Sequence, residues 1–145
     1  MRRRYRYVEH TADVEFVAYG RKPDELFKNA FLAMFDTAAD IKLLSKQKSR
    51  TIRFSLKERS EEAEDLLWRA LQDALSIASA RGLFAYGVES LHLEETKKGL
   101  VLSATLLCKK ETAELAKLDV KGVSKYDLVV SKKGGRLEAS VVLDV

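Results

Sequence analysis

Apolar residues recur at two different spacings along this chain, and the order of the two spacings is the strongest constraint on the fold. A spacing of two residues predicts strands at 5–9 and 13–19, and the same spacing returns throughout the second half of the chain. Spacings of three and four residues predict one helix after Pro23 and another between Ser60 and Gly82. Two helices inserted among such strands predict an α+β domain, with a mixed or antiparallel sheet and both helices packed on one face.

Both predicted helices carry the sequence signals of helix ends. Pro23 suits the first turn of the first helix, and two acids follow it near the positive end of the helix dipole. Ser60 is the predicted N-cap of the second helix, which ends at Gly82. Trp68 falls outside the apolar stripe of that helix, and we expect it to cover the edge of the stripe. We interpret both stripes as buried helix faces: Leu26, Phe27, Ala30, Phe31, Met34 and Phe35, then Ala63, Leu66, Leu67, Ala70, Leu71, Ala74, Leu75 and Ala78.

The remaining strands and the length of the chain indicate one domain. Gly99 and the pair Gly134–Gly135 suit hairpin turns. Residues 1–145 contain one proline and no repeat or linker, and a chain of this size buries roughly 68–70% of its unfolded surface. The predicted strands outside the first pair are 50–57, 83–95, 100–108, 118–130 with a break, and 136–145.

Composition excludes two classes of protein. Cys108 is the only cysteine, so a disulfide framework is excluded, and its apolar neighbours predict a buried thiol. The longest uncharged stretch, 99–108, has 10 residues, whereas a membrane-spanning helix needs roughly 20. The first residues are rich in arginine but no apolar segment follows them, so we expect a cytoplasmic protein rather than a secreted one.

Charge is unevenly distributed along the chain, which has a net charge of +4. Both ends are basic and residues 54–95 are acidic, which weakly indicates a polyanionic partner. The segment Arg2–Tyr7 interleaves arginines with two tyrosines, a composition that serves RNA phosphates and stacked bases together. The alternative is a basic arm that leads into a strand, with the tyrosines as ordinary strand residues.

Standard catalytic motifs are missing from the sequence. There is no phosphate-binding glycine loop, no nucleophile elbow and no cysteine pair with zinc spacing. His92 alternates with leucines, so we expect a solvated strand residue. The segment His10–Asp13 places an imidazole, a hydroxyl and a carboxylate in a loop between two strands, where they could converge. Local hydrogen bonds in an ordinary turn explain the same segment without any site.

Two further segments carry charge in unusual places. Asp144 is the penultimate residue of an apolar strand, and Val145 carries the terminal carboxylate. If that strand ran beside Asp13, the carboxylates would need a cation, either a lysine or a hard metal ion such as calcium. A solvated, frayed chain end is the alternative. Residues 119–127 are strand-like but broken at glycine, and Lys121 there could meet a carboxylate or a phosphate, or belong to a charged edge strand.

Together these segments resemble the archease family, whose members are partners of the RtcB-type RNA ligase that joins tRNA halves. The resemblance spans the whole chain in order. It rests on His10-Thr11-Ala12-Asp13-Val14, Ala18-Tyr19-Gly20, Asp65-Leu66-Leu67-Trp68, Val120-Lys121-Gly122-Val123 and Val141-Val142-Leu143-Asp144-Val145.

The resemblance implies an activator that is not itself an enzyme. Archeases promote guanylylation of the ligase and its multiple turnover, and they broaden its nucleotide use. Carried over by position, the family's metal site, assigned to calcium or another divalent metal, falls on Asp13, Asp144 and Val145. Lys121 and His10 join the two aspartates as residues implied to activate the partner. We expect tRNA as an indirect partner through the ligase and, from the lack of a long apolar stretch, no membrane partner.

One segment departs from the family pattern. Lys125 and Tyr126 stand where the family has a tyrosine and a histidine, so a role that rests on that histidine is not expected here. Two other classes remain open. One is a basic RNA-binding module or chaperone acting on tRNA or a tRNA-modifying enzyme, through Arg2–Tyr7 and the later lysines. The other is a metal-dependent hydrolase, which we disfavour because His10 would have to serve alone as its base.

Overall fold

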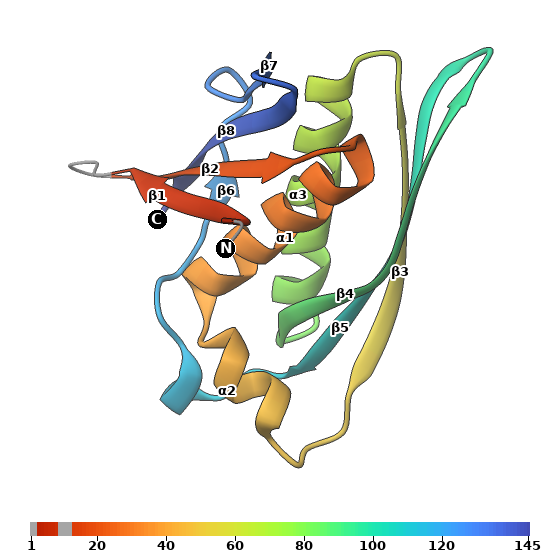
Figure 1. Ribbon diagram of the computed structural model, residues 1–145. Helices are drawn as coiled ribbons and strands as arrows, with labels where there is room; N and C mark the ends of the chain where they lie inside the picture. Colours follow the sequence, from red (N-terminus) through yellow and green to blue (C-terminus); the bar gives the residue numbers. More distant parts are fainter. Residues whose placement is uncertain (1–2, 9–12) are drawn as a thin grey trace.

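The computed structural model describes residues 3–8 and 13–145 (Figure 1). Strands, two long helices and shorter helical turns follow one another in this part of the chain. Their order is β1 (Tyr5–Val8), β2 (Val14–Gly20), α1 (Pro23–Ala38), α2 (Ile41–Lys46), β3 (Ile52–Ser60), α3 (Ala63–Ala80), β4 (Leu83–Thr96), β5 (Gly99–Lys110), the 3-10 turn η1 (Ala113–Leu115), β6 (Gly122–Val123), β7 (Val129–Lys133) and β8 (Arg136–Asp144).

The strands form two antiparallel sheets rather than one. The first has the order β1-β2-β8-β6, with β7 also paired to β8, and the second has the order β3-β5-β4. Helices α1 and α3 lie between the two sheets and contact strands of both (Figure 1). The predicted α+β class is therefore confirmed, and the helices are covered on two sides instead of one.

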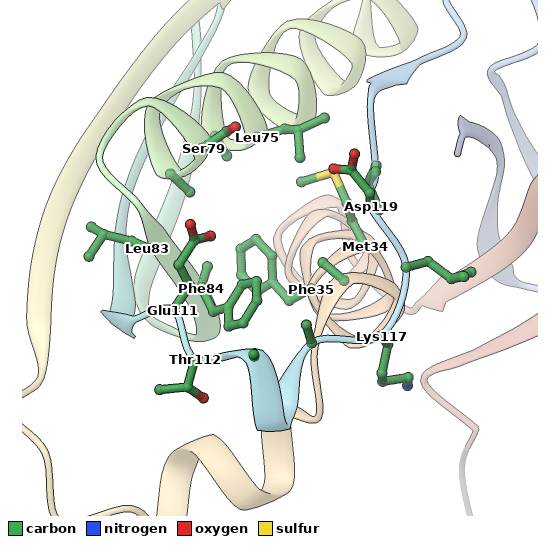
Figure 2. A pocket seen from close by; sticks show the side chains of 18 residues that line it. Met34, Phe35, Leu75, Ser79, Leu83, Phe84, Glu111, Thr112, Lys117 and Asp119 are labelled. Carbon is green, nitrogen blue, oxygen red and sulfur yellow. The ribbon is translucent and has the colours of Figure 1, made fainter.

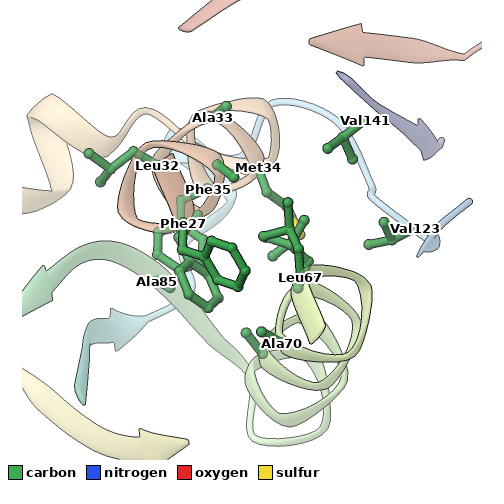
Figure 3. Packing of buried hydrophobic residues seen from close by; sticks show 14 of the residues in the cluster. Phe27, Leu32, Ala33, Met34, Phe35, Leu67, Ala70, Ala85, Val123 and Val141 are labelled. Atoms are coloured by element: carbon green, nitrogen blue, oxygen red, sulfur yellow. The ribbon is translucent and has the colours of Figure 1, made fainter. Parts of the chain in front are cut away.

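Burial on two sides explains the composition of α1. Phe27, Phe31 and Met34 are each at most 2% exposed. Figure 3 shows Phe27 and Met34 packed in the cluster that also holds Leu67 and Ala70 of α3. Pro23 begins the helix, as predicted, and the acids of the first turn favour its positive end. A helix that is apolar over so wide an arc is stable only when both faces are covered.

The second long helix begins slightly later than the sequence indicated. Ser60 is the last residue of β3, and the helical residues begin at Ala63. The Ser60 hydroxyl accepts a hydrogen bond from the Glu62 backbone at 3.2 Å and donates one to Asp65 at 2.7 Å. Ser60 therefore fixes the turn that leads into the helix rather than capping the helix directly.

Two other elements differ from the predicted ones. The short helix α2 was not predicted. Asp40 caps it by accepting a hydrogen bond from the Leu43 backbone, and its own residue Leu44 is fully buried. The predicted strand at 118–130 is reduced to β6 and the start of β7, because the backbone of Leu118 instead bonds to the end of α1. No helix among the residues that the structure describes is long and apolar enough to cross a membrane.

Candidate functional site

Three segments that are distant in the sequence meet at the C-terminal end of β8. On one side, Val14 of β2 pairs with Leu143; Asp13 directly precedes this last pair and Asp144 directly follows it. On the other side, Gly122 of β6 pairs with Asp144. The sheet register thus brings the start of β2, the end of the chain and β6 to one place, which we call the tip. Figure 1 shows β2, β6 and the C-terminus at the same side of the molecule.

The backbone at the tip is held by short hydrogen bonds. The Lys121 N–H donates to the Asp144 carbonyl at 2.7 Å, and the Ser124 N–H donates to the Val142 carbonyl at 2.9 Å. A side chain at Gly122 would meet a carboxylate oxygen of Asp144 at 3.6 Å, so that carboxylate lies over β6. The end of the chain is therefore part of the sheet, which argues against the frayed alternative.

Helix α3 fixes β6 in place. The Trp68 indole N–H donates to the Val123 carbonyl at 2.8 Å, and the Gln72 side-chain oxygen accepts from the Val123 N–H at 2.9 Å. Trp68 is half-buried, as expected for a residue that covers the edge of the stripe. Gln72 was missed by the sequence reasoning. The only available signal was its position four residues after Trp68, on the same helix face.

The donor groups at the tip are carboxylate oxygens. Asp144 is exposed, and Asp13 and Val145 are half-buried. No ion pair found in residues 3–8 and 13–145 involves Asp13, Asp144 or Lys121. The same residues contain no group of three or more His, Cys, Asp or Glu side chains placed to hold a metal. The structure thus brings together two aspartates, the chain end and the Lys121 backbone, whereas the predicted His10 lies outside the described residues.

The two positions that depart from the family pattern lie in the loop after β6. The Lys125 ammonium stands 5.0 Å from the centre of the Trp68 ring and 4.0 Å from an Asp65 oxygen. The Arg69 guanidinium hydrogen-bonds the same Asp65 and, with Ser60, holds the pKa of that carboxyl below its usual range. Tyr126 is 95% exposed. Lys125 therefore packs back on α3, and Tyr126 projects into solvent.

The basic arm at the N-terminus is largely built into the fold. Tyr5 donates a hydrogen bond to Asp36 at 3.0 Å, and Tyr7 donates one to the Ala33 carbonyl at 2.9 Å. Burial raises the pKa of Tyr7 to about 12, and burial followed by the Asp36 charge raises the pKa of Tyr5 as well. These tyrosines serve as strand residues that pack on α1, which weighs against base stacking. Arg2 lies outside the described residues.

The remaining candidates for chemistry behave as predicted. Cys108 is fully buried, and burial raises the pKa of its thiol to about 12, so the thiolate nucleophile is not available near neutral pH. His92 is exposed on β4 and lies opposite Ser103 of β5. Neither residue lies in any of the strands that meet at the tip.

The fold and the tip define a small α+β domain in which two antiparallel sheets enclose two helices, with Asp13 and Asp144 at the same end of the paired strands β2 and β8. The sequence model of the Archease protein family (MTH1598/TM1083) matches residues 5–145. The chain belongs to the archease family.

Relatives and solved structures of this family agree over nearly the full length. The chain is 30% identical to the archease of Pyrococcus abyssi and 29% identical to that of Methanosarcina mazei, covering 99% of itself in both cases and 99% and 97% of those proteins. It resembles the solution structure of protein 1598 of Methanobacterium thermoautotrophicum, with a TM-score of 0.79, 27% identity and coverage of 98% and 99% of the two chains. A crystal structure from Thermotoga maritima, described as an archease and possible chaperone, shares the fold, with a TM-score of 0.64, 19% identity and coverage of 100% and 98%.

Proposed function

We propose that this protein activates an RtcB-type RNA ligase by promoting its guanylylation and multiple turnover and by broadening its nucleotide use. Membership of the archease family supports a role as an accessory to another enzyme. The observation that supports the proposal is the sheet register: Asp13 and Asp144 adjoin the last residue pair of β2 and β8, and the Lys121 N–H bonds to the Asp144 carbonyl. A cytoplasmic location is part of the same proposal.

The donor set at the tip fits a hard divalent cation. Asp13, Asp144 and the terminal carboxylate of Val145 offer only oxygen atoms, the ligands that calcium prefers, and neighbouring carboxylates repel one another unless a cation lies between them. These three residues would hold calcium or another divalent metal. Such a cation, when bound, supplies positive charge for phosphate oxygens of a nucleotide.

The chain's own residues would position this charge rather than perform a reaction. Trp68 and Gln72 hold β6 against α3, and β6 in turn holds Lys121 beside Asp144. The Lys121 ammonium offers a second cation for phosphate, and His10 joins it in contacting the ligase. The ligase supplies the nucleophile and the groups that assist departure of the leaving group. The tip acts at the entrance of the ligase active site by proximity and by preorganised electrostatics.

A guanylylation assay with tip variants tests the proposal. Asp13→Ala and Asp144→Ala should each reduce the stimulated rate of ligase guanylylation by roughly a hundredfold, the lower end of the loss expected on removing one preorganised electrostatic contact. Glu94→Ala is the matched control, because it removes an exposed carboxylate from β4 and leaves the tip intact. Circular dichroism should confirm that all variants are folded. Full stimulation by both aspartate variants would overturn the proposal.

The alternative RNA-binding function is tested by a separate measurement. It requires tight tRNA binding without the ligase, with an affinity that falls steeply with salt. The Tyr5 and Tyr7 hydroxyls both bond to residues of α1, which favours ordinary strand residues over a free base-stacking arm. Removal of residues 1–4 should therefore leave ligase activation unchanged, and its loss would favour the RNA-binding alternative.

A further inference from the structure

An open cavity of about 540 Å³ lies between α1, α3, the start of β4 and the segment 111–120 (Figure 2). Its volume is within the range of roughly 300–1,000 Å³ that is typical of ligand pockets. The walls are mostly apolar, and Met34, Phe35 and Leu83 among them are each under 7% exposed. None of the tip residues Asp13, Asp144 and Val145 lines it.

The opening of the cavity is negatively charged. Figure 2 shows the Glu111 and Asp119 side chains at its edge, with the Lys117 amino group directed away. That amino group lies 3.4 Å from an Asp36 oxygen, outside the cavity. Within residues 3–8 and 13–145, neither Glu111 nor Asp119 takes part in an ion pair. The rim therefore presents two carboxylates in a chain whose net charge is positive.

The segment 111–120 forms an exposed apolar shoulder of the cavity. Leu118 is 47% exposed, one of few large apolar side chains so exposed, and Ala113 and Ala116 are exposed beside it. A small molecule that packs only against the buried walls at Met34, Phe35 and Leu83 would leave this shoulder in water. A short peptide segment can place one apolar side chain in the cavity and cover the shoulder with its neighbours.

We propose that this cavity is a docking site for a segment of a partner protein in which an apolar side chain is flanked by lysine or arginine. Burial of the apolar side chain against Met34, Phe35 and Leu83 supplies the attraction. The flanking basic residues face Glu111 and Asp119, which select against acidic segments and set the orientation. The site is built from residues other than the tip aspartates, so it stands independently of the ligase proposal.

Matched peptides test the docking site on the intact protein. The probes are acetyl-Lys-Leu-Phe-Lys-amide and acetyl-Glu-Leu-Phe-Glu-amide at millimolar concentration, followed by methyl NMR. The basic peptide should shift the methyl signals of Met34, Leu75, Leu83 and Leu118 in a saturable way. It should bind about tenfold more tightly than the acidic peptide, the scale expected for a few partly exposed charge pairs.

Charge variants make the test specific. Glu111→Gln combined with Asp119→Asn should bring the two peptides to nearly equal affinity, whereas Glu114→Gln, on η1 but outside the cavity, should leave the preference unchanged. Equal affinity of both peptides for the unmodified protein, or no saturable shift of the four methyl groups, overturns the proposal. The proposal is also overturned if 3-phenylpropylamine binds as tightly as the basic peptide, because the ligand would then be a small molecule. A third contradicting result is an unmodified protein that is dimeric in solution and a double variant that is monomeric, because a second copy of the chain would then occupy the cavity.

Discussion

At the scale of single residues, one pair of acids makes the stability of the protein sensitive to pH. Glu58 of β3 lies beside Asp73 of α3 where the helix packs on the second sheet. Burial, and then hydrogen bonding to and repulsion by Asp73, raise the pKa of Glu58 from 4.5 to about 7, and Arg69 offsets part of this rise. Glu58 therefore holds a proton in the folded protein under conditions in which it would lose that proton in the unfolded chain.

This pKa shift predicts that the protein loses stability as the pH rises. A group whose folded pKa is raised contributes stability below its unfolded pKa, and this contribution disappears as the pH passes through its folded pKa. The melting temperature should therefore fall as the pH rises from 4.5 to 7, and the part of this fall that is due to Glu58 should be absent in the Glu58→Gln variant. Thermal melts of both proteins across this range check the prediction, with Glu94→Gln as the control. A fall of equal size in the Glu58→Gln protein would contradict it.

The candidate site was predictable from single residues only in part. Asp13, Asp144 and Lys121 could be selected because their residue types and positions were unusual. The roles of Trp68 and Gln72 could not, because they depend on β6 lying beside α3, a contact between residues about 50 positions apart. Periodicity reports which side of a helix is buried, but it does not report which strand covers that side.

At the scale of elements, the junction between β2 and α1 depends on a close approach of two backbones. A Cβ at Gly20 would lie 2.7 Å from the Cα of Leu26 and 3.0 Å from the carbonyl carbon of Glu25. Backbone atoms in the first turn of a helix cannot move aside as a flexible side chain does. Only glycine therefore allows β2 to end so close to α1.

Substitution of this glycine should destabilise the fold. Gly20→Ala forces the first turn of α1 away from β2 and should lower the free energy of unfolding by roughly 1–3 kcal/mol, the range for overpacking. Gly87→Ala is a suitable control, because its Cβ would meet only the Leu107 side chain at an ordinary 3.5 Å. Urea unfolding of the two variants measures the difference. Equal midpoints would show that the junction tolerates a side chain.

The elements themselves were predictable to different degrees. The long helices α1 and α3 could be predicted because apolar residues at helical spacing form a stripe that must be buried in the core of a small domain. The strand β6 has only two residues, and its pairing with Asp144 depends on the fold of the rest of the chain. The helix α2 has six residues, too few for periodicity, and only the capping side chain of Asp40 signals it.

At the scale of the whole molecule, the two ends of the described chain are joined through one sheet. Strand β8 pairs with β2 near the N-terminus and with β6 and β7, so the last residues complete a structure that begins at Asp13. This arrangement suits a protein that presents a charged edge to a larger enzyme.

Binding of calcium at the tip should stabilise the whole fold. A cation that binds only the folded chain raises the free energy of unfolding by about 2.7 kcal/mol when its concentration is one hundred times the dissociation constant. For a domain of this size this corresponds to a rise in melting temperature of roughly 5–10 °C. Asp13→Asn and Asp144→Asn should lose the rise, and Glu94→Gln should keep it. A rise that persists in both aspartate variants would place the binding elsewhere.

The number of ligations completed by each molecule of ligase tests the central proposal most directly. The measurement compares an RtcB-type ligase alone with the same ligase in the presence of this protein, at saturating RNA ends and GTP. We predict about one ligation per ligase without the protein and many with it, and a return to about one with the Asp13→Ala, Asp144→Ala double variant. An unchanged number of ligations in the presence of the unmodified protein would contradict the proposed function.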